Sequence, residues 1–250
     1  MIGGEAYPNG VAFYTDEVWV KATRGRDQNI RVEVRRKVLS QSRWRKRVAA
    51  IPFVRGLALM GDLVMAHWRL YIAGCLGGGV LLFLMGDTLL QNGTSDSLHT
   101  ITWYGELLML ALFLAAVVVI RLTGISRYHG AEHQVVAAYL THGDIERDKV
   151  LAASRVSSRC GSNLAVFQIL SYGLLTCFPL SVWLKILLSY MIGYELFLCD
   201  ERGRWRWVLS PFYRISGWLQ GRLLTSKPTD NELEVAESAF LTLHRLRKER

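Results

Sequence analysis

The chain has 250 residues, enough for one or two domains with a sizeable core, and 51% of them are hydrophobic. Its 30 Lys and Arg residues outnumber its 21 Asp and Glu residues, which gives a formal net charge of +9. The apolar residues are concentrated in blocks and the basic residues cluster beside these blocks, as in membrane proteins whose Lys and Arg contact anionic lipid head groups. We therefore do not expect nucleic acid as a partner.

The four cysteines do not form a disulfide framework. Cys75, Cys177 and Cys199 lie in or next to apolar blocks, where a free cysteine behaves as a small hydrophobic residue, whereas Cys160 lies in a polar stretch. The absence of a Cys-x-x-Cys pair argues against a structural zinc ribbon. No basic region followed by an apolar run opens the chain, so we expect no cleaved signal peptide.

The N-terminal unit, residues 1–47, is predicted to be a small β-rich domain that ends in a basic cluster. Residues 18–22 alternate loosely and residues 30–34 alternate cleanly between β-branched and charged side chains, which predicts two strands. Residues 25–29 are turn-like, so we expect a hairpin, and Gly3-Gly4 is predicted to form a tight turn before it. A hairpin alone is too small to be stable and must dock on the rest of the chain.

Residues 48–70 form the second unit, which we predict to be an interfacial amphipathic helix. Apolar residues recur at helical spacing from Phe53 to Val64, and Arg55 and Asp62 lie on the opposite side. Charges so close to the middle of a helix favour a position at the membrane surface over one across the membrane.

The third unit, residues 71–199, is predicted to be the membrane domain. Its apolar stretches are residues 72–90, 101–122, 164–183 and 186–198, and the last is short enough to be a re-entrant helix. The expected fold class is therefore a mainly α-helical integral membrane protein. It would have about four transmembrane or re-entrant helices, interfacial amphipathic helices and a small N-terminal β-rich unit.

The distribution of Lys and Arg predicts the topology. These residues are dense before residue 72 and after Arg202, present at 121–159 and missing from the loop at 91–100. By the positive-inside rule both termini and the polar segment 123–163 are cytoplasmic. The last unit, residues 200–250, mixes aromatic and basic residues and ends in an amphipathic helix with a capping box, so we expect it at the membrane edge.

The run Tyr128-His129-Gly130-Ala131-Glu132-His133 carries the candidate chemistry. In a helix, His129 and His133 are one turn apart and Glu132 projects from the same face. Two imidazoles at this spacing can share a tetrahedral Zn²⁺, and the carboxylate can take a proton from a metal-activated water. The order His-x-x-Glu-His is the inverzincin pattern. Gly130 costs about 1 kcal/mol of helix propensity, which predicts a close backbone approach there.

A zinc site needs at least three protein ligands, so another side chain must join His129 and His133. The candidates are Cys160, Glu195, Glu5 and His142. We favour Glu195, expected near the cytoplasmic end of the last apolar stretch, with Cys160 as an alternative or structural ligand. Two structural readings stay open. Glu195 can pair with Arg127 or Arg159, and the histidine motif can be the polar face of a helix beside the membrane.

Several short motifs together resemble one family. They are Gly3-Gly4-Glu5-Ala6, Ile51-Pro52-Phe53-Val54-Arg55-Gly56, the run 128–133, Arg159-Cys160-Gly161, Gly193-Tyr194-Glu195-Leu196 and Trp218-Leu219-Gln220 followed by residues 225–230. Over nearly the whole chain they are similar to the YqhQ-like family of bacterial membrane proteins, which are described as metal-dependent enzymes without a settled activity. The chain departs from that pattern at Asn9, where the family has Glu, and at Ser157, where it has His.

We therefore expect a metal-dependent membrane enzyme in the bacterial cytoplasmic membrane. It would be a hydrolase that uses a metal-activated water at the cytoplasmic interface, with a divalent metal, zinc, as cofactor and Glu132 moving the proton. The departures at Asn9 and Ser157 favour the alternative, a non-catalytic scaffold or assembly protein in which the His/Glu cluster is a structural polar network. Carboxylates within the apolar stretches, Glu106 and Glu195, also allow a transporter-like function. The expected partners are the lipid bilayer, anionic head groups, and further copies of the chain or other membrane proteins.

Overall fold

The computed structural model describes residues 2–36, 47–48, 50–66, 68–69, 72, 114–115, 117–201 and 206–249. The strands are β1 (Gly3–Tyr7), β2 (Gly10–Tyr14), β3 (Val18–Arg24) and β4 (Ile30–Arg36). The helices are α2 (Val54–Ala66), α5 (Ile125–His142), α6 (Arg147–Ala152), α7 (Gly161–Leu175), α8 (Val182–Glu201), α9 (Arg206–Leu219) and α10 (Asp230–Lys248), and a π-helix, η1 (Gln220–Leu224), follows α9.

The four strands form one antiparallel sheet in the order β1-β2-β3-β4. The predicted hairpin is confirmed, because β3 and β4 pair with Val20 opposite Val34. Gln28 adopts a left-handed conformation (φ 63°) in its turn, which lets the chain reverse within a few residues. The tight turn predicted at Gly3-Gly4 is wrong, since both glycines lie in β1 and pair with residues of β2.

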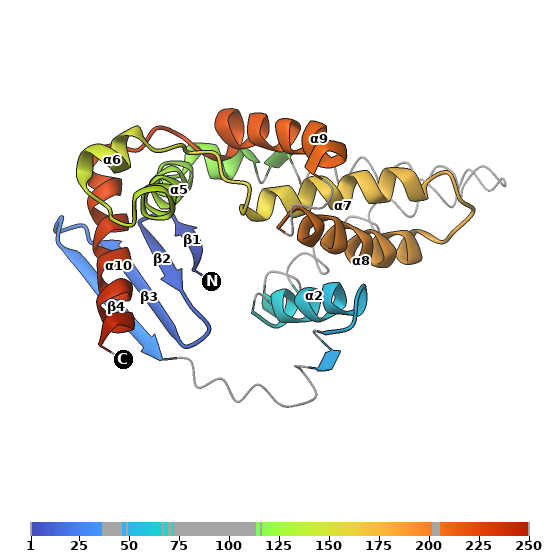
Figure 1. Ribbon diagram of the computed structural model, residues 1–250, viewed down its shortest axis with the longest axis horizontal. Helices are drawn as coiled ribbons and strands as arrows, with labels where there is room; N and C mark the ends of the chain where they lie inside the picture. Colours follow the sequence, from blue (N-terminus) through green and yellow to red (C-terminus); the bar gives the residue numbers. More distant parts are fainter. Residues whose placement is uncertain are drawn as a thin grey trace, which may run out of the picture.

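Helices α5 and α10 cover one face of this sheet (Figure 1). Alternate residues of β2 and β3, among them Val11, Phe13 and Val20, point toward them and are fully buried. The ring of Phe13 meets that of Phe240 edge to face, with the centroids 5.3 Å apart. Each of these large apolar side chains contributes about 1.5–3 kcal/mol by leaving water, so this is the core of the protein.

Helix α10 docks on the sheet as its sequence pattern predicts. Leu233, Ala236 and Phe240 recur at helical spacing and are buried against β2, β3 and α5. The capping box is confirmed: the Thr229 N–H donates to the Glu232 carboxylate at 2.7 Å, which satisfies one of the amides that the first helical turn leaves unpaired.

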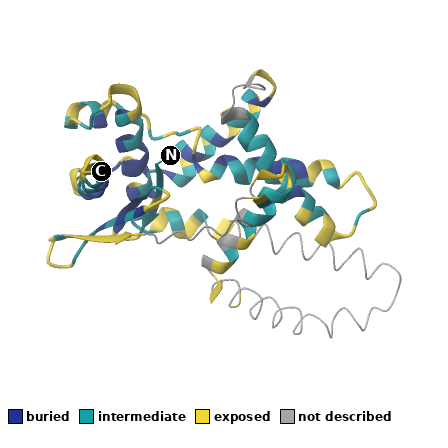
Figure 2. Cartoon of the chain, turned by 60° about the horizontal axis from the view of Figure 1, so that its bottom comes forward, coloured by how far each residue is buried: buried dark blue, intermediate teal, exposed yellow. Residues whose placement is uncertain are grey.

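A second, helical region extends away from the sheet (Figure 1). Helices α7 and α8 pack closely because Gly193 brings α8 against the backbone of Gln168, where a β-carbon would stand 2.9 Å from that backbone. Gly56 likewise lets α2 approach the Tyr190 carbonyl of α8. Figure 2 shows that buried residues gather in the sheet and α5, whereas the outer helices are largely exposed or half-buried.

The expected fold class, an integral membrane protein with about four transmembrane or re-entrant helices, is wrong. Among the described residues only α8 is long and apolar enough to cross a membrane, with Val182–Cys199 as its apolar window. The stretch at 164–183 breaks before its end: α7 stops at Leu175, and its 15 residues span about 22 Å, less than the hydrocarbon core of about 30 Å. The stretches at 72–90 and 101–122, with Glu106, fall largely outside the described residues.

Candidate metal centre

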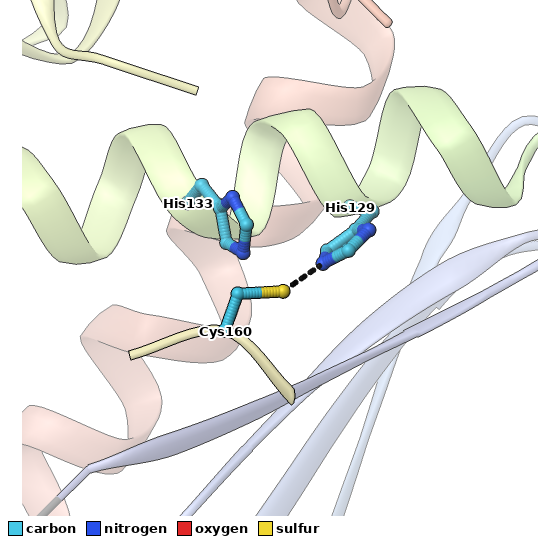
Figure 3. A group of neighbouring side chains, drawn as sticks. All are labelled: His129, His133 and Cys160. Atoms are coloured by element: carbon cyan, nitrogen blue, oxygen red, sulfur yellow. Dashed lines mark hydrogen bonds between the residues drawn. The ribbon is translucent and has the colours of Figure 1, made fainter. Parts of the chain in front are cut away.

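Three side chains from two elements converge on one point beside the sheet. His129 and His133 lie one turn apart on α5, and Cys160 immediately precedes α7 (Figure 3). The ligand atoms of all three lie within 4.8 Å of one another, and the Cys160 Sγ is 3.5 Å from His129 Nε2. Because two imidazole nitrogens and a sulfur meet at this separation, the group can hold a metal ion.

Backbone carbonyls fix the orientation of both imidazoles. His133 Nδ1 lies 2.6 Å from the carbonyl oxygen of Arg155, and His129 Nδ1 lies 3.3 Å from that of Leu224. A carbonyl oxygen only accepts, so each Nδ1 must carry the proton and donate. Both Nε2 lone pairs therefore point into the group, the arrangement found around histidine metal ligands.

The loop that carries Cys160 is held from several sides. Gln134 of α5 donates to the Ala153 carbonyl at 3.0 Å, and Asn163 of α7 donates to the Ser158 carbonyl at 2.7 Å. These bonds fix the loop at two points before Cys160, which is itself only 8% exposed. The sulfur also lies at the start of α7, where the helix dipole stabilises negative charge. Its position is thus set by the fold before any ligand binds.

Glu132 lies beside the three ligand atoms. Its Oε2 is 3.6 Å from His133 Nε2 and 3.9 Å from His129 Nε2. Burial raises the pKa of Glu132 to about 7; His129 opposes this shift and Glu5 adds to it. At neutral pH the carboxyl group is therefore close to half-protonated, which suits a group that accepts and releases a proton.

Two glycines make room for this arrangement. A β-carbon at Gly130 would collide with the carbonyl oxygen of Ser226, so the close backbone approach predicted from this helical glycine is confirmed. The segment of Ser226 is held there by its N–H, which donates to the Ser126 carbonyl at 2.8 Å. A β-carbon at Gly4 of β1 would collide with the carboxylate of Glu132. The missing side chains thus bring α5 against a neighbouring segment and against the sheet.

The structure does not bring Glu195, the favoured third ligand, to the histidines. Its carboxylate forms a two-pronged ion pair with Arg55 and accepts from the Phe53 N–H at 2.7 Å, in the contact between α2 and α8. The partners considered for it lie elsewhere; Arg127, for example, faces Glu232 at 3.6 Å.

The two other candidates are also outside the group. Glu5 accepts a hydrogen bond from the Tyr7 hydroxyl at 2.7 Å. His142 is the last residue of α5, about 13 Å along the helix from His133. Cys160, considered as the alternative ligand, is therefore the one that the structure places with the two histidines.

Sequence reasoning missed the residues that orient the imidazoles. Arg155 and Leu224 act through their carbonyl oxygens, which every residue type has, so no sequence pattern could identify them. Gly4 did carry a signal, because paired glycines outside a turn often mark a close approach of another group.

The protein thus combines a four-stranded sheet covered by two helices with a His-His-Cys group that can hold a metal ion. Residues 62–245 match the family described as "Protein of unknown function (DUF1385)", and the chain belongs to that family. It is similar to "Uncharacterized protein YqhQ" of Bacillus subtilis (strain 168), with 32% identity over 133 residues. The match covers 48% of this chain and 40% of that protein. The resemblance to the YqhQ-like family is thus confirmed, and no solved structure matches the chain.

Proposed function

We propose that this protein is a zinc-dependent hydrolase in which His129, His133 and Cys160 hold the metal and Glu132 moves the proton. The observation that carries the proposal is the convergence of three ligand atoms within 4.8 Å, with both imidazoles already oriented by backbone carbonyls. Packing in a core does not require two Nε2 lone pairs and a sulfur to be directed at one point, whereas metal binding does.

The donor set fits zinc. Zinc binds imidazole nitrogen and thiolate sulfur in tetrahedral sites, and three protein ligands leave the fourth position for a reacting molecule. When bound, it would supply a Lewis acid that polarises a substrate carbonyl or phosphoryl oxygen and makes a water molecule more acidic. With zinc bound, Cys160 would be a thiolate ligand and the two imidazoles would be neutral ligands.

The protein's own part is to position groups and to move the proton. Glu132 would accept a proton from the attacking water molecule and return it to the leaving group. Burial of this carboxylate, whose side chain is 11% exposed, also excludes water that would screen its charge. His129 keeps 21% of its side chain exposed against 4% for His133, so the substrate enters on the His129 side.

A second function is favoured by one specific observation. The same polar contacts connect α5 to the loop before α7 and to the end of η1, through the Arg155 and Leu224 carbonyls. A scaffold or assembly protein would use such a network to hold its segments together without any metal. In that case the Cys160–His129 contact at 3.5 Å is a weak hydrogen bond within a structural cluster.

A position at the cytoplasmic face of a membrane is part of the proposal. It is supported by the apolar window Val182–Cys199 and by large side chains that reach into solvent, such as Trp183 at 78% and Trp207 at 80% exposure. Exposed tryptophans beside basic residues are typical of membrane interfaces. Fractionation of cells that express the full chain checks it: recovery in the soluble fraction alone would refute this part.

The metal content of the purified full-length protein tests the function. Wild type is expected to hold close to one zinc per chain, whereas His129→Ala and Cys160→Ala lose it. His142→Ala is the matched control, because it removes a histidine from the same helix outside the group. Glu132→Gln keeps the metal and loses hydrolysis of a screened substrate. A folded wild type that contains no metal and takes up no added zinc would refute the enzyme and favour the scaffold.

A further inference from the structure

His129, His133 and Cys160 are called the metal-binding group below. A cavity of about 450 Å³ lies outside this group, between the loop before α7 and helices α9 and η1. Its lining residues are Val156, Ser157, Ser158, Asn163, Ser210, Tyr213, Arg214, Gly217 and Gln220. Its volume falls within the range of about 300–1,000 Å³ that is usual for small-molecule sites. The cavity is therefore large enough for a ligand the size of a metabolite or a lipid head group.

Most residues that line the cavity have polar side chains, and the only sign of charge among them is positive. Ser157, Ser158, Ser210 and Tyr213 bring hydroxyl groups, and the guanidinium of Arg214 is the one charged group among the described lining residues. No carboxylate lines the cavity in the part of the chain that the structure describes. A hydroxyl-rich cavity with a cation and no acid favours an anion.

The amide side chains in the lining, Asn163 and Gln220, hold the cavity wall together. Gln220 accepts the Ser157 N–H at 2.9 Å and donates to the Ser157 carbonyl at 3.1 Å. Asn163 donates to the same carbonyl at 3.0 Å. These bonds hold the wall of the cavity in place, so the cavity is preformed. Asn163 also lies in the first turn of α7, whose positive end faces negative charge favourably.

Two walls of the cavity also support the metal ligands. Ser157 and Ser158 belong to the loop that ends in Cys160. The π-helix η1 begins with Gln220 in the cavity wall and ends with Leu224, whose carbonyl orients His129. π-Helical turns occur frequently at functional sites. The loop before α7 and η1 therefore take part in both the cavity and the support of the metal-binding group.

We propose that this cavity binds a phosphate group, with Arg214 as its cation, and that the molecule carrying it is a phosphate-bearing substrate. A phosphate group offers several acceptor oxygens, which hydroxyl donors and a forked guanidinium can bind together. The binding of this molecule in the cavity does not depend on the proposed function. Its reaction at the neighbouring metal-binding group does rest on the proposed function. The source is either a soluble phosphate compound or a phospholipid head group. The lipid source needs a test of its own, because α9 also exposes Trp207 and Trp218.

Binding of inorganic phosphate to the full-length protein, followed by calorimetry, tests the proposal. Wild type is expected to bind phosphate, and Arg214→Gln should weaken that binding by about tenfold or more, since it removes a charge-assisted hydrogen bond. Arg222→Gln is the matched control, because Arg222 is also exposed, belongs to the adjoining η1 and does not line the cavity. Circular dichroism checks that both variants are folded.

Binding to lipid vesicles distinguishes a phospholipid head group from a soluble phosphate compound. Vesicles of phosphatidylglycerol in phosphatidylcholine are compared with phosphatidylcholine alone. Lipid is the source if Arg214→Gln, but not Arg222→Gln, reduces binding to the anionic vesicles and inorganic phosphate competes for it. A soluble compound is the source if only inorganic phosphate shows this dependence on Arg214.

Two results would overturn the proposal. One is a wild type that binds neither inorganic phosphate nor anionic vesicles, and the other is an equal loss in Arg214→Gln and Arg222→Gln, which would indicate unspecific charge attraction. His129→Ala keeps this test independent of the proposed function. If it lacks zinc and still binds phosphate, the cavity is a phosphate site by itself. Phosphate binding in a wild type that holds no metal would likewise support the site and refute only the enzyme.

Discussion

The sheet region, made of β1–β4, α5 and α10, buries most of its large apolar side chains, whereas the helical region of α2, α7, α8 and α9 exposes many of its own. Phe13 and Phe240 are at most 2% exposed, but Trp183 is 78% and Leu174 62% exposed. The helices of the sheet region have one apolar face each, which the sheet covers. Helices α7 and α8 are apolar around their circumference, so a single neighbour cannot cover them.

The two regions also differ in how they hold charge. The sheet region buries Glu132 beside two imidazoles and a thiol, an arrangement that can bind a metal ion. In the helical region a partly buried carboxylate, Glu195, and a partly buried guanidinium, Arg55, neutralise each other. Glu132, the carboxylate that we propose moves a proton, thus has a counterpart in the helical region, Glu195, that forms an ion pair. Each of the following changes is made in one region, and the other region is the reference with which its effect is compared.

The largest effect is expected from Arg55→Gln. Both side chains of the Arg55–Glu195 pair are 14% exposed, and removal of one partner leaves a partly buried charge uncompensated, at a cost of about 3 kcal/mol in the free energy of unfolding. Denaturant unfolding measures this loss, and zinc content is expected to stay unchanged. Arg31→Gln is the control, since Arg31 pairs with Asp27 at the surface and such pairs contribute about 1 kcal/mol or less. Equal losses in both variants would contradict this prediction.

Removal of the zinc ion that we propose at His129, His133 and Cys160 should destabilise the sheet region. A ligand that binds the folded state alone stabilises it by about 2.7 kcal/mol at a free concentration of 100 Kd. A chelator is therefore expected to lower the Tm of wild type and to leave that of His129→Ala unchanged. Hydrogen exchange should show faster exchange in α5 and in the Cys160 loop, with α8 unaffected. An identical response of α5 and α8 would show that the two regions are not independent.

Gly130→Ala tests the close approach between α5 and the segment of Ser226. The new β-carbon would collide with the Ser226 carbonyl, which belongs to the backbone and has to move. We expect a loss of about 1–3 kcal/mol, as for other overpacked sites, together with weaker zinc binding because the Leu224 carbonyl moves with its neighbours. Thermal unfolding with and without zinc measures both effects. An unchanged Tm would mean that the two backbones can separate at no cost.

Gly173→Ala is the matched change in the helical region, with the smallest effect and the opposite sign. Nothing lies within 4 Å of the position that its β-carbon would occupy on α7. Alanine in an open helical position is more favourable than glycine by about 0.5–1 kcal/mol, so the free energy of unfolding should rise. A loss of stability would show that α7 is covered at this point in solution.

Several local features could be predicted from the sequence. The β3–β4 hairpin follows from the alternation at residues 30–34, and the start of α10 follows from Thr229 and Glu232, because both depend on residues close in the chain. Gly130 was identified as a place of close approach, although Ser226 could not be named as its neighbour. The apolar stretch at 164–183 was misread, because periodicity does not show where a helix ends around Thr176.

The sequence by itself determined that His129, Glu132 and His133 share one face of a helix, because their spacing of three and four residues matches the helical repeat. Only the tertiary structure decided that Cys160 joins them and that Glu195 pairs with Arg55 instead. That choice depends on how distant segments pack, and the carbonyls that orient the imidazoles belong to the backbone. Neither the packing of distant segments nor the direction of a carbonyl is encoded in the spacing of side chains along the chain.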